Sequence, residues 1–442
     1  MSPPSTLLVS YTFPPAGGVV VQRALALARY LPQAGCSTHV LTARNPVTHV
    51  YDPALAERIP SSVAVHRVGA VETPYALRQA VKRAAGLRRS QPATAAGAAP
   101  SGAPPHPLKQ LAKAVVERLV FPDPQRNWSR AALSAASRLI ERERLASVLI
   151  TVPPFSLLRM AVPLRRRFPD LRIVLDFRDE WLEYHLNGLD GTASAWKRAR
   201  AAELEAAAVA AADFVVTVTP TWVERLRRRY ATQPASKFVL IPNGYDPGTV
   251  ADLHPTPPLA PPLVVSYLGT LYANPVYTPQ SYLQALDLLG PEWYGRIETR
   301  FIGRVAPEAA ALLENGPFPL VQTGFLPQDE ALARLQQSHC LLLLLGTADV
   351  HSGKLFEYLA TGLPILAVTP HGGEAARVIE ETGAGLVAAP DNPVEIAAAL
   401  QRLYAHATGA ATEPLPTRHP ERIAVYDRSV QARTFAGLLQ PR

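Results

Sequence analysis

Short apolar runs alternate with amphipathic helical patterns along almost the whole chain. In the first half, the runs that predict strands are residues 7–11, 38–42, 63–68, 147–151, 172–177, 214–218 and 237–241. Stretches with helical periodicity separate most of them. Because parallel strands need helix-sized crossovers, this alternation is typical of parallel α/β sheets.

The alternation restarts after a proline-rich tract, HPTPPLAPP at 254–262, which we interpret as a domain boundary. Predicted strands then cover 263–268, 298–302, 320–323, 341–345, 364–368 and 385–387, and predicted helices cover 279–289, 307–315, 329–338, 353–361, 374–381 and 393–406. We expect two doubly wound sheets whose strands end on either side of a ligand-binding cleft. The Pro/Ala/Gly-rich segment at 90–107 predicts a flexible surface insertion.

The composition is that of a globular protein. The 442 residues are 48% hydrophobic and 18% charged, which is enough for two domains with separate cores. Cys36 and Cys340 lie in apolar segments without zinc-site spacing, so we expect buried thiols in a reducing, cytoplasmic compartment. The amino terminus lacks a signal-peptide pattern, and no apolar run approaches the roughly 20 residues that cross a bilayer. We expect a soluble or peripheral protein.

The net charge of +8 is concentrated in three basic clusters, within 75–120, at 165–167 and at 225–229. A basic face with interleaved leucine and valine suits an anionic membrane surface, such as the inner face of a cell membrane, or a phosphorylated acceptor. The alternative is that these are solvated charges on helices, and both interpretations stay open. Nucleic acid is not an expected partner, because neither aromatic interleaving nor a known motif accompanies the charges.

Two motifs follow predicted strands of the first half. In YTFPPAGG at 11–18, Gly17 and Gly18 let the backbone approach a ligand at the start of a helix, although G-x-G-x-x-G is absent. The alternative is a tight turn without a ligand. In VLDFRDEW at 174–181, Asp176, Arg178 and Asp179 can bind hydroxyls or act as a base. The alternative there is an internal Arg–Asp ion pair.

The second half carries HSGKLFEYLATGLPILAV at 351–368. Ser352 suits the start of a helix, so Lys354 and the N–H groups near Gly353 and Leu355 can hold a diphosphate. Glu357, one turn into the helix, can bind ribose hydroxyls bidentately. Asp349 precedes Glu357 by eight residues and can reach the other end of the same ligand.

Further candidates end neighbouring strands of this half. Arg304 is the last residue of the segment FIGR at 301–304, at the carboxyl end of a predicted strand. Phe325 and Leu326 lie in the segment TGFLP at 323–327, where a nucleobase can pack. No Asp-x-Asp pair occurs in the chain, so we expect no metal requirement and no cofactor.

Taken together, these motifs resemble those of glycosyltransferase family 4, in particular its bacterial branch with YxFPP…GG, DFRDxW and SGKLFEYLAxGxPIL. FPDPQRNW at 121–128, DFVVTVTP at 213–220 and IPNGYD at 241–246 add to the resemblance. The resemblance implies an α/β, GT-B fold with two Rossmann-like domains facing across a cleft. Residues 1–245 would bind the acceptor, residues 246–419 a nucleotide diphosphate sugar, and the helix at 420–442 would pack back on the first domain.

The resemblance also implies residue roles and an activity. Glu357 and Asp349 match the two acids of the family's E-x7-E motif, Lys354 matches its phosphate-binding lysine, and Gly17 with Gly18 matches the glycine loop that faces the donor. The implied activity is a retaining hexosyltransferase (EC 2.4) in cell-surface polysaccharide or glycolipid biosynthesis. The acceptor is a glycan, a lipid-linked molecule or a small molecule. A catalytically weak or inactive sugar-nucleotide-binding scaffold is the alternative, followed by an epimerase or a phosphorylase.

The chain departs from the family pattern at three places. The first acid is Asp349 rather than glutamate, and Arg178 beside Asp179 replaces a frequent histidine. Thr270 stands where an arginine is common, with no lysine following. We expect Arg304, with Arg23 as a further candidate, to serve as the additional phosphate cation. Otherwise leaving-group stabilisation rests heavily on Lys354 and the helix terminus.

Overall fold

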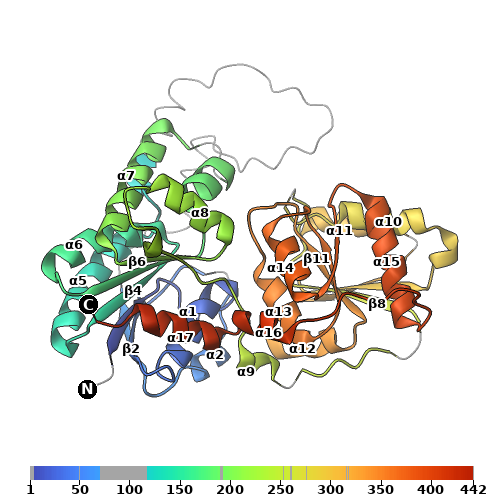
Figure 1. Ribbon diagram of the computed structural model, residues 1–442, viewed down its shortest axis with the longest axis horizontal. Coiled ribbons are helices and arrows are strands. Elements are labelled where there is room, and N and C mark those ends of the chain that lie inside the picture. Colours follow the sequence, from blue (N-terminus) through green and yellow to red (C-terminus); the bar gives the residue numbers. More distant parts are fainter. Residues whose placement is uncertain are drawn as a thin grey trace. The chain divides into compact units, whose positions relative to one another are not determined.

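The computed structural model describes residues 4–48, 50–69, 117–189, 193–251, 253–258, 261–274, 276–314, 316 and 318–441. The expected insertion at 90–107 and most of the basic cluster within 75–120 lie outside these residues. The chain divides into two units, of which the first comprises Met1–Pro242 with Gln431–Arg442 and the second comprises Asn243–Val430 (Figure 1).

The first unit is built on a parallel sheet with strand order β3-β2-β1-β4-β5-β6-β7. Its strands are β1 (Ser5–Val9), β2 (Ser37–Ala43), β3 (Ala64–Val68), β4 (Ser147–Val152), β5 (Arg172–Phe177), β6 (Phe214–Thr217) and β7 (Phe238–Leu240). The sheet is doubly wound, and its strand order reverses between β1 and β4.

Helices cover both faces of this sheet. They are α1 (Val19–Tyr30), α2 (Ala54–Glu57), α5 (Arg126–Glu143), η1 (Phe155–Met160), α6 (Ala161–Arg167), the π-helix η2 (Trp181–Leu189), α7 (Ala195–Ala211), α8 (Pro220–Arg229), η3 (Ala235–Lys237) and the terminal α17 (Arg428–Leu438). One core joins the sheet to α5, α6, α7 and α8, and the opposite core joins it to α1, α2 and α17 (Figure 1). Phe435, Ala436 and Leu439 therefore complete the core of a unit that otherwise ends at Pro242.

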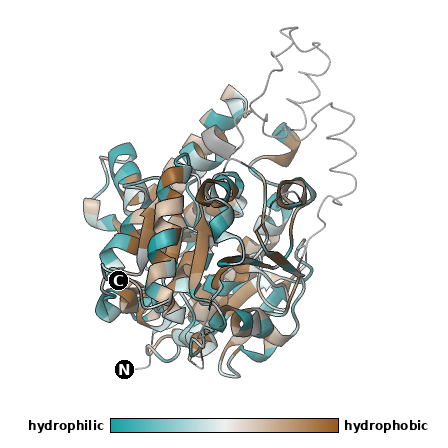
Figure 2. Cartoon of the chain, turned by 90° about the vertical axis from the view of Figure 1, so that its right-hand side faces the viewer, coloured by the Kyte–Doolittle hydropathy of each residue, from teal (hydrophilic) through white to brown (hydrophobic). Residues whose placement is uncertain are grey.

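The second unit has a parallel sheet with strand order β10-β9-β8-β11-β12-β13. Its strands are β8 (Leu263–Leu268), β9 (Ile297–Ile302), β10 (Leu320–Gly324), β11 (Cys340–Leu344), β12 (Ile365–Val368) and β13 (Gly385–Ala388). The order reverses between β8 and β11. Figure 2 shows strands coloured as hydrophobic between helices that mix hydrophobic and hydrophilic residues, as expected for a sheet covered on both faces.

The helices of the second unit are α9 (Pro247–Val250), α10 (Gln280–Leu289), η4 (Pro291–Trp293), α11 (Pro307–Leu313), α12 (Gln328–Gln336), α13 (Gly353–Thr361), α14 (Glu374–Thr382), α15 (Pro393–Ala407), α16 (Pro420–Ile423) and η5 (Ala424–Tyr426). One core gathers α10, α11 and α15 against the sheet. Some helices of the molecule begin at a side-chain cap. In α15, for example, Asn392 Oδ1 accepts a hydrogen bond from Glu395 N and Pro393 occupies the first turn.

The predicted fold class is confirmed, because both sheets are parallel and doubly wound. Every predicted strand is present, but β1 covers Ser5–Val9 rather than 7–11. The apolar pattern missed the start of β1 because Ser5 and Thr6 are polar. The Thr6 hydroxyl is nevertheless buried, where it donates to Ser147 O. Tyr11 leaves the strand and packs edge-on against Trp128, 5.3 Å between ring centroids.

Two expectations from composition concern burial and membranes. Cys36 and Cys340 are both buried and unpaired, and burial raises the pKa of their thiols to about 11 and about 12. Within the described ranges, no helix has the length and apolar character that a membrane span requires.

Candidate functional site

The reversal of strand order in the second unit lies between β8 and β11. These strands pair only at Cys340 with Val265 and Leu341 with Ser266. Beyond that point the Tyr358 hydroxyl of α13 joins them, since it accepts a hydrogen bond from Leu268 N at 2.7 Å and donates to Leu342 O at 3.3 Å. Doubly wound sheets bind ligands at the carboxyl ends of the strands that flank such a reversal.

Helix α13 begins at this edge of the sheet. The Ser352 hydroxyl caps it, accepting a hydrogen bond from Lys354 N at 3.4 Å, and Gly362 ends it with φ 81°. The structure corrects the expectation that the Leu355 amide binds a phosphate. This amide already donates to Ser352 O at 3.1 Å, and the Leu355 side chain is buried. The expected phosphate donors of this turn therefore reduce to the Gly353 amide, the helix dipole and the Lys354 side chain.

Lys354 is half-buried and packs against the end of β8. Its Nζ donates a hydrogen bond to Tyr267 Oη and lies 3.9 Å from the centroid of the Tyr267 ring. A Cβ atom at Gly269 would lie 3.0 Å from Lys354 Cε, so the glycine makes room for the lysine stem. Burial lowers the pKa of Lys354 to about 7, while the Glu357 carboxylate acts in the opposite direction. A phosphate placed here would meet a poorly solvated ammonium and interact strongly with it.

Both predicted acids lie on the same edge of the sheet. Glu357 is half-buried one turn into α13, where burial raises the pKa of its carboxyl and the charges of Arg428 and Lys354 lower it. Asp349 is half-buried in the loop between β11 and α13. A hydrogen bond of 2.7 Å from Glu374 N to Ala348 O holds this loop. Asp349 therefore lies in a loop held by a backbone hydrogen bond, and Glu357, eight residues later, lies in the first turns of the helix that follows.

Glycines with positive φ end the three neighbouring strands β8, β9 and β10. They are Gly269 (φ 100°), Gly303 (φ 133°) and Gly324 (φ 72°). Next to them, the Arg304 guanidinium lies 5.2 Å from the ring centroid of Phe325, whose side chain is 62% exposed. Leu326 follows and is half-buried. The structure brings Arg304 and Phe325 together and leaves both accessible.

Gly303→Ala is expected to disturb this edge through a backbone collision. Its Cβ would lie 2.6 Å from Gly269 O, and Gly269 in turn packs on Lys354. We expect a loss of about 1–3 kcal/mol of stability from the positive φ, and a further loss from displacement of the β8 loop. Urea unfolding followed by hydrogen exchange of the second unit measures it.

Gly324→Ala is the matched control. Gly324 also has a positive φ, but a Cβ there would meet nothing within 4 Å. Equal losses in the two variants would show that the contact between Gly303 and Gly269 is unimportant.

In the first unit, the two loop glycines have different roles. Gly17 is buried, its amide donates to Val50 O at 3.0 Å, and a Cβ would lie 2.9 Å from side-chain atoms of Val50 and Asp52. Packing alone explains this glycine. Gly18 is exposed, has φ 84° and begins α1 without a side-chain cap, which leaves the first amides of the helix open to an anion.

Arg178 and Asp179 follow β5 at the carboxyl edge of the first sheet. The Arg178 guanidinium donates to Val152 O, Val20 O and Pro153 O at 3.4, 2.5 and 2.7 Å. It therefore ties the start of α1 to the end of β4. Asp179 is half-buried and lies 3.7 Å from His185. The predicted roles of Arg178 and Asp179 near the sugar stay predictions.

The structure corrects the expectations for Asp176 and Arg23. Asp176 is fully buried, and Arg23 Nη2 and Nε lie 2.9 and 3.0 Å from its two carboxylate oxygens. The same guanidinium donates to Pro242 O at 2.7 Å and Ile241 O at 2.9 Å. Asp176 therefore forms the internal ion pair given as the alternative, with Arg23 rather than Arg178 as its partner, and Arg23 is not available for a phosphate.

The described basic clusters are largely paired within the first unit. Arg165 contacts Asp213 and Arg167 contacts Glu141, while Arg225, Arg227 and Arg229 contact Glu183, Glu224 and the buried Glu205, respectively. These pairs favour the alternative of structural and solvated charges over a free basic face at these positions.

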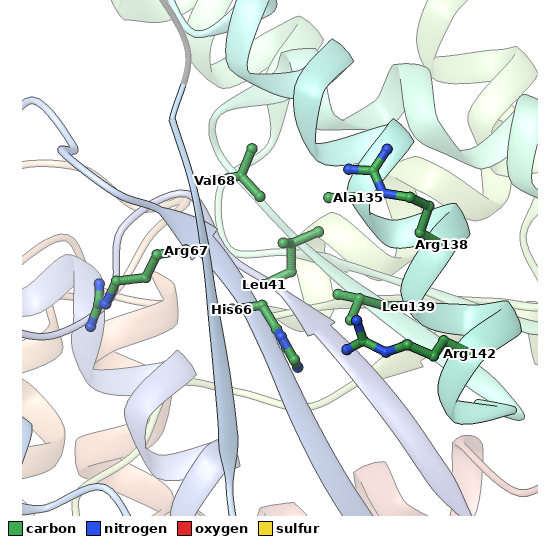
Figure 3. A pocket seen from close by; sticks show the side chains of 8 residues that line it. All are labelled: Leu41, His66, Arg67, Val68, Ala135, Arg138, Leu139 and Arg142. Carbon is green, nitrogen blue, oxygen red and sulfur yellow. The ribbon is translucent and has the colours of Figure 1, made fainter.

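A hollow of about 240 Å³ lies between α5 and the edge strand β3 (Figure 3). Arg142 and His66 border it, whereas Arg67 points away and donates to Pro14 O. Arg142 is engaged by Glu143 at 2.7 Å. The hollow includes none of the predicted site residues, and we assign it no ligand.

Sequence reasoning missed Tyr267 and Tyr358, which connect Lys354 and its helix to β8. Both lie in apolar segments and are fully buried, so their pattern is that of core residues. Gly269 and Gly303 were also missed. A glycine directly after each of two neighbouring predicted strands was a usable signal.

Comparison with known proteins identifies two domains. Residues 94–249 match the model of Glycosyltransferase Family 4, and residues 262–406 match that of Glycosyl transferases group 1. No curated protein matches the sequence.

Solved structures share the fold. A sucrose-phosphate synthase from Thermosynechococcus elongatus is 14% identical with a TM-score of 0.63, covering 98% of both chains. Anabaena Alr3699/HepE in complex with UDP-glucose is 13% identical with a TM-score of 0.57, covering 98% of this chain and 99% of that one. WaaG, a glycosyltransferase involved in lipopolysaccharide biosynthesis, is 14% identical with a TM-score of 0.54, covering 98% and 95%. The fold is GT-B, and the chain carries two glycosyltransferase domains.

Proposed function

We propose, from the premise of these two glycosyltransferase domains, that the protein transfers a sugar from a nucleoside diphosphate sugar to an acceptor hydroxyl with retention at the anomeric carbon. The observation that carries the proposal is the position of Lys354. Its stem lies on Gly269, and it projects from the first turn of α13 at the β8–β11 reversal. An ammonium and a helix amino end together suit a diphosphate.

The proposed chemistry requires charge stabilisation at the leaving group. As the bond between the anomeric carbon and the diphosphate oxygen stretches, negative charge grows on that oxygen and positive charge on the sugar ring. Lys354, the Gly353 amide and the α13 dipole would stabilise the oxygen. The residues of the second unit would therefore supply the leaving-group half of catalysis without a metal ion.

Other residues of the second unit would hold the rest of the donor. Glu357 would accept hydrogen bonds from the ribose hydroxyls and Asp349 from the transferred sugar. The exposed Arg304 and Phe325, with Leu326, would pack on the base.

The first unit would contribute the open amino end of α1 at Gly18, together with Arg178 and Asp179 near the sugar. The acceptor would be a glycan, a lipid-linked molecule or a small molecule, handled in the cytoplasm or at the inner membrane face. The fold shared with a glycosyltransferase of lipopolysaccharide biosynthesis supports cell-surface glycan synthesis as the setting.

A donor screen tests the proposal on the full chain. A nucleoside diphosphate sugar at a hundred times its dissociation constant should stabilise the protein by about 2.7 kcal/mol, visible as a thermal shift. UDP-sugars come first, because a protein of the same fold is solved with UDP-glucose. UMP is the control and should stabilise less, since it lacks the second phosphate and the sugar.

Hits are then assayed for release of nucleoside diphosphate with and without acceptor. Tight binding without release would favour the non-catalytic scaffold. Failure of every nucleoside diphosphate sugar to bind would contradict the proposal.

A further inference from the structure

The Lys354 ammonium has an internal partner in Tyr267 of β8. Tyr267 is fully buried, and its hydroxyl donates a hydrogen bond to Thr270 O at 3.0 Å. The same oxygen accepts a hydrogen bond from Lys354 Nζ, which also lies above the ring at 3.9 Å from its centroid. The side chain thus offers the ammonium both a hydrogen-bond acceptor and a cation–π contact.

We infer that Tyr267 is a positioning residue that keeps Lys354 charged and fixed at the β8–β11 reversal before the donor binds. This inference rests on the proposed function of Lys354 as the cation for the donor diphosphate. The relevant contacts form a relay from Lys354 Nζ through Tyr267 Oη to the Thr270 carbonyl. Donation by Tyr267 to that carbonyl makes its oxygen a better acceptor for the ammonium.

The relay opposes the effect of burial on Lys354. Burial favours the neutral amine and lowers the pKa of Lys354 to about 7, whereas a hydrogen bond to the charged form favours the ammonium. Glu357 of α13 acts in the same direction as the relay, and Arg428 of α17 offsets part of the Glu357 charge. Burial raises the pKa of the Tyr267 hydroxyl, and Tyr277 and Tyr272 in the loop after β8 act in the same direction.

The lysine stem is held by the same strand. Gly269, directly after β8, packs against Lys354 Cε, and Gly303, directly after β9, lies close against the Gly269 backbone. Tyr267 and the glycines that follow β8 and β9 therefore surround the lysine side chain without any ligand. Thr270 contributes its carbonyl to the relay, although its side chain stands where the family often has an arginine.

Tyr267→Phe tests the inference in the intact protein, because it removes the acceptor and keeps the ring. Competitive acetylation with peptide mapping from pH 5 to 10 measures the pKa of Lys354. The wild type should titrate near pH 7 and the variant about one pH unit lower, because a hydrogen bond to a charged group is lost. Unchanged titration would overturn the inference.

Tyr358→Phe is the matched control. Its hydroxyl is also buried and also donates to a backbone carbonyl, but it accepts from Leu268 N and donates to Leu342 O rather than contacting Lys354. It should destabilise the protein without moving the Lys354 titration. An equal shift in both variants would show a general structural effect and contradict the inference. If Tyr267→Phe does not fold, 3-fluorotyrosine at position 267 keeps the shape and weakens the acceptor, and should shift the pKa in the same direction.

Kinetics provide the second readout. Since the donor needs the ammonium, kcat/KM for the donor should fall above the Lys354 pKa. In Tyr267→Phe this alkaline limb should move down by the same unit, so that the variant is about twofold slower than the wild type at pH 6 and about tenfold slower at pH 8. A loss of equal size at both pH values would indicate a merely structural role.

UDP separates the two proposals. Protection of Lys354 from acetylation by UDP supports its role as a phosphate ligand. Protection combined with an unshifted Tyr267→Phe titration overturns the positioning role alone. A shifted titration without protection supports positioning and contradicts the proposed donor site.

Discussion

Lys354→Met is expected to lower kcat by about a hundredfold or more while the protein stays folded. Loss of one preorganised charge contact at a leaving group costs about 3 kcal/mol in the transition state. Methionine keeps the apolar stem that packs on Gly269 and Tyr267, so the change isolates the ammonium. Release of nucleoside diphosphate at saturating donor measures the effect.

The melting temperature provides the control for Lys354→Met. Because the ammonium is poorly solvated in the free protein, its replacement by an apolar side chain should leave the melting temperature unchanged or raise it. Turnover like that of the wild type would remove Lys354 from the reaction. A large fall in the melting temperature would show that the lysine holds the fold instead.

Asp176→Ala is expected to destabilise the first unit by about 3–5 kcal/mol. It leaves the Arg23 guanidinium buried without its counter-ion, which is costly in an interior of low dielectric constant. Arg23 also contacts Pro242 O, Ile241 O and the Phe435 ring, so the loss should spread from β5 to α1 and α17. Hydrogen exchange read peptide by peptide should show deprotection of these elements and normal protection of the second unit.

Glu203→Ala is the matched control for this ion pair. Glu203 pairs with Arg200 at 2.5 Å on the surface, where both side chains are more than half exposed. Such a pair contributes about 0–1 kcal/mol. If Asp176→Ala were as stable as Glu203→Ala yet inactive, Asp176 would act in chemistry rather than in folding.

The sequence allowed the sheets to be predicted well because their central strands are buried on both faces. The runs at 172–177 and 263–268 match β5 and β8 residue for residue. In both, a mostly apolar run ends at a polar or glycine-containing turn. Where a strand starts with polar residues, as β1 does at half-buried Ser5 and buried Thr6, the pattern gave the wrong boundary.

Partners of side chains were much harder to predict. Periodicity indicates which face a residue lies on, but not which distant group it meets. Asp176 meets Arg23 across 153 positions, and Lys354 meets Tyr267 across 87. The motif predicted that α13 begins at Ser352, which the structure confirms, whereas the hydrogen bond from the Leu355 amide to Ser352 O depends on the geometry of one turn. The roles of the two domains came from the resemblance rather than from the pattern.

Phe435, Ala436 and Leu439 give the first unit a discontinuous sequence, and this affects how the protein is made. During translation, the segment up to Pro242 leaves the ribosome long before these residues exist. The apolar surface of α1 that they cover stays uncovered while the whole second unit is synthesised, a period in which nascent chains are prone to aggregate. For the same reason, expression of residues 1–242 alone would yield an incomplete domain unless the carboxyl-terminal peptide were fused to it.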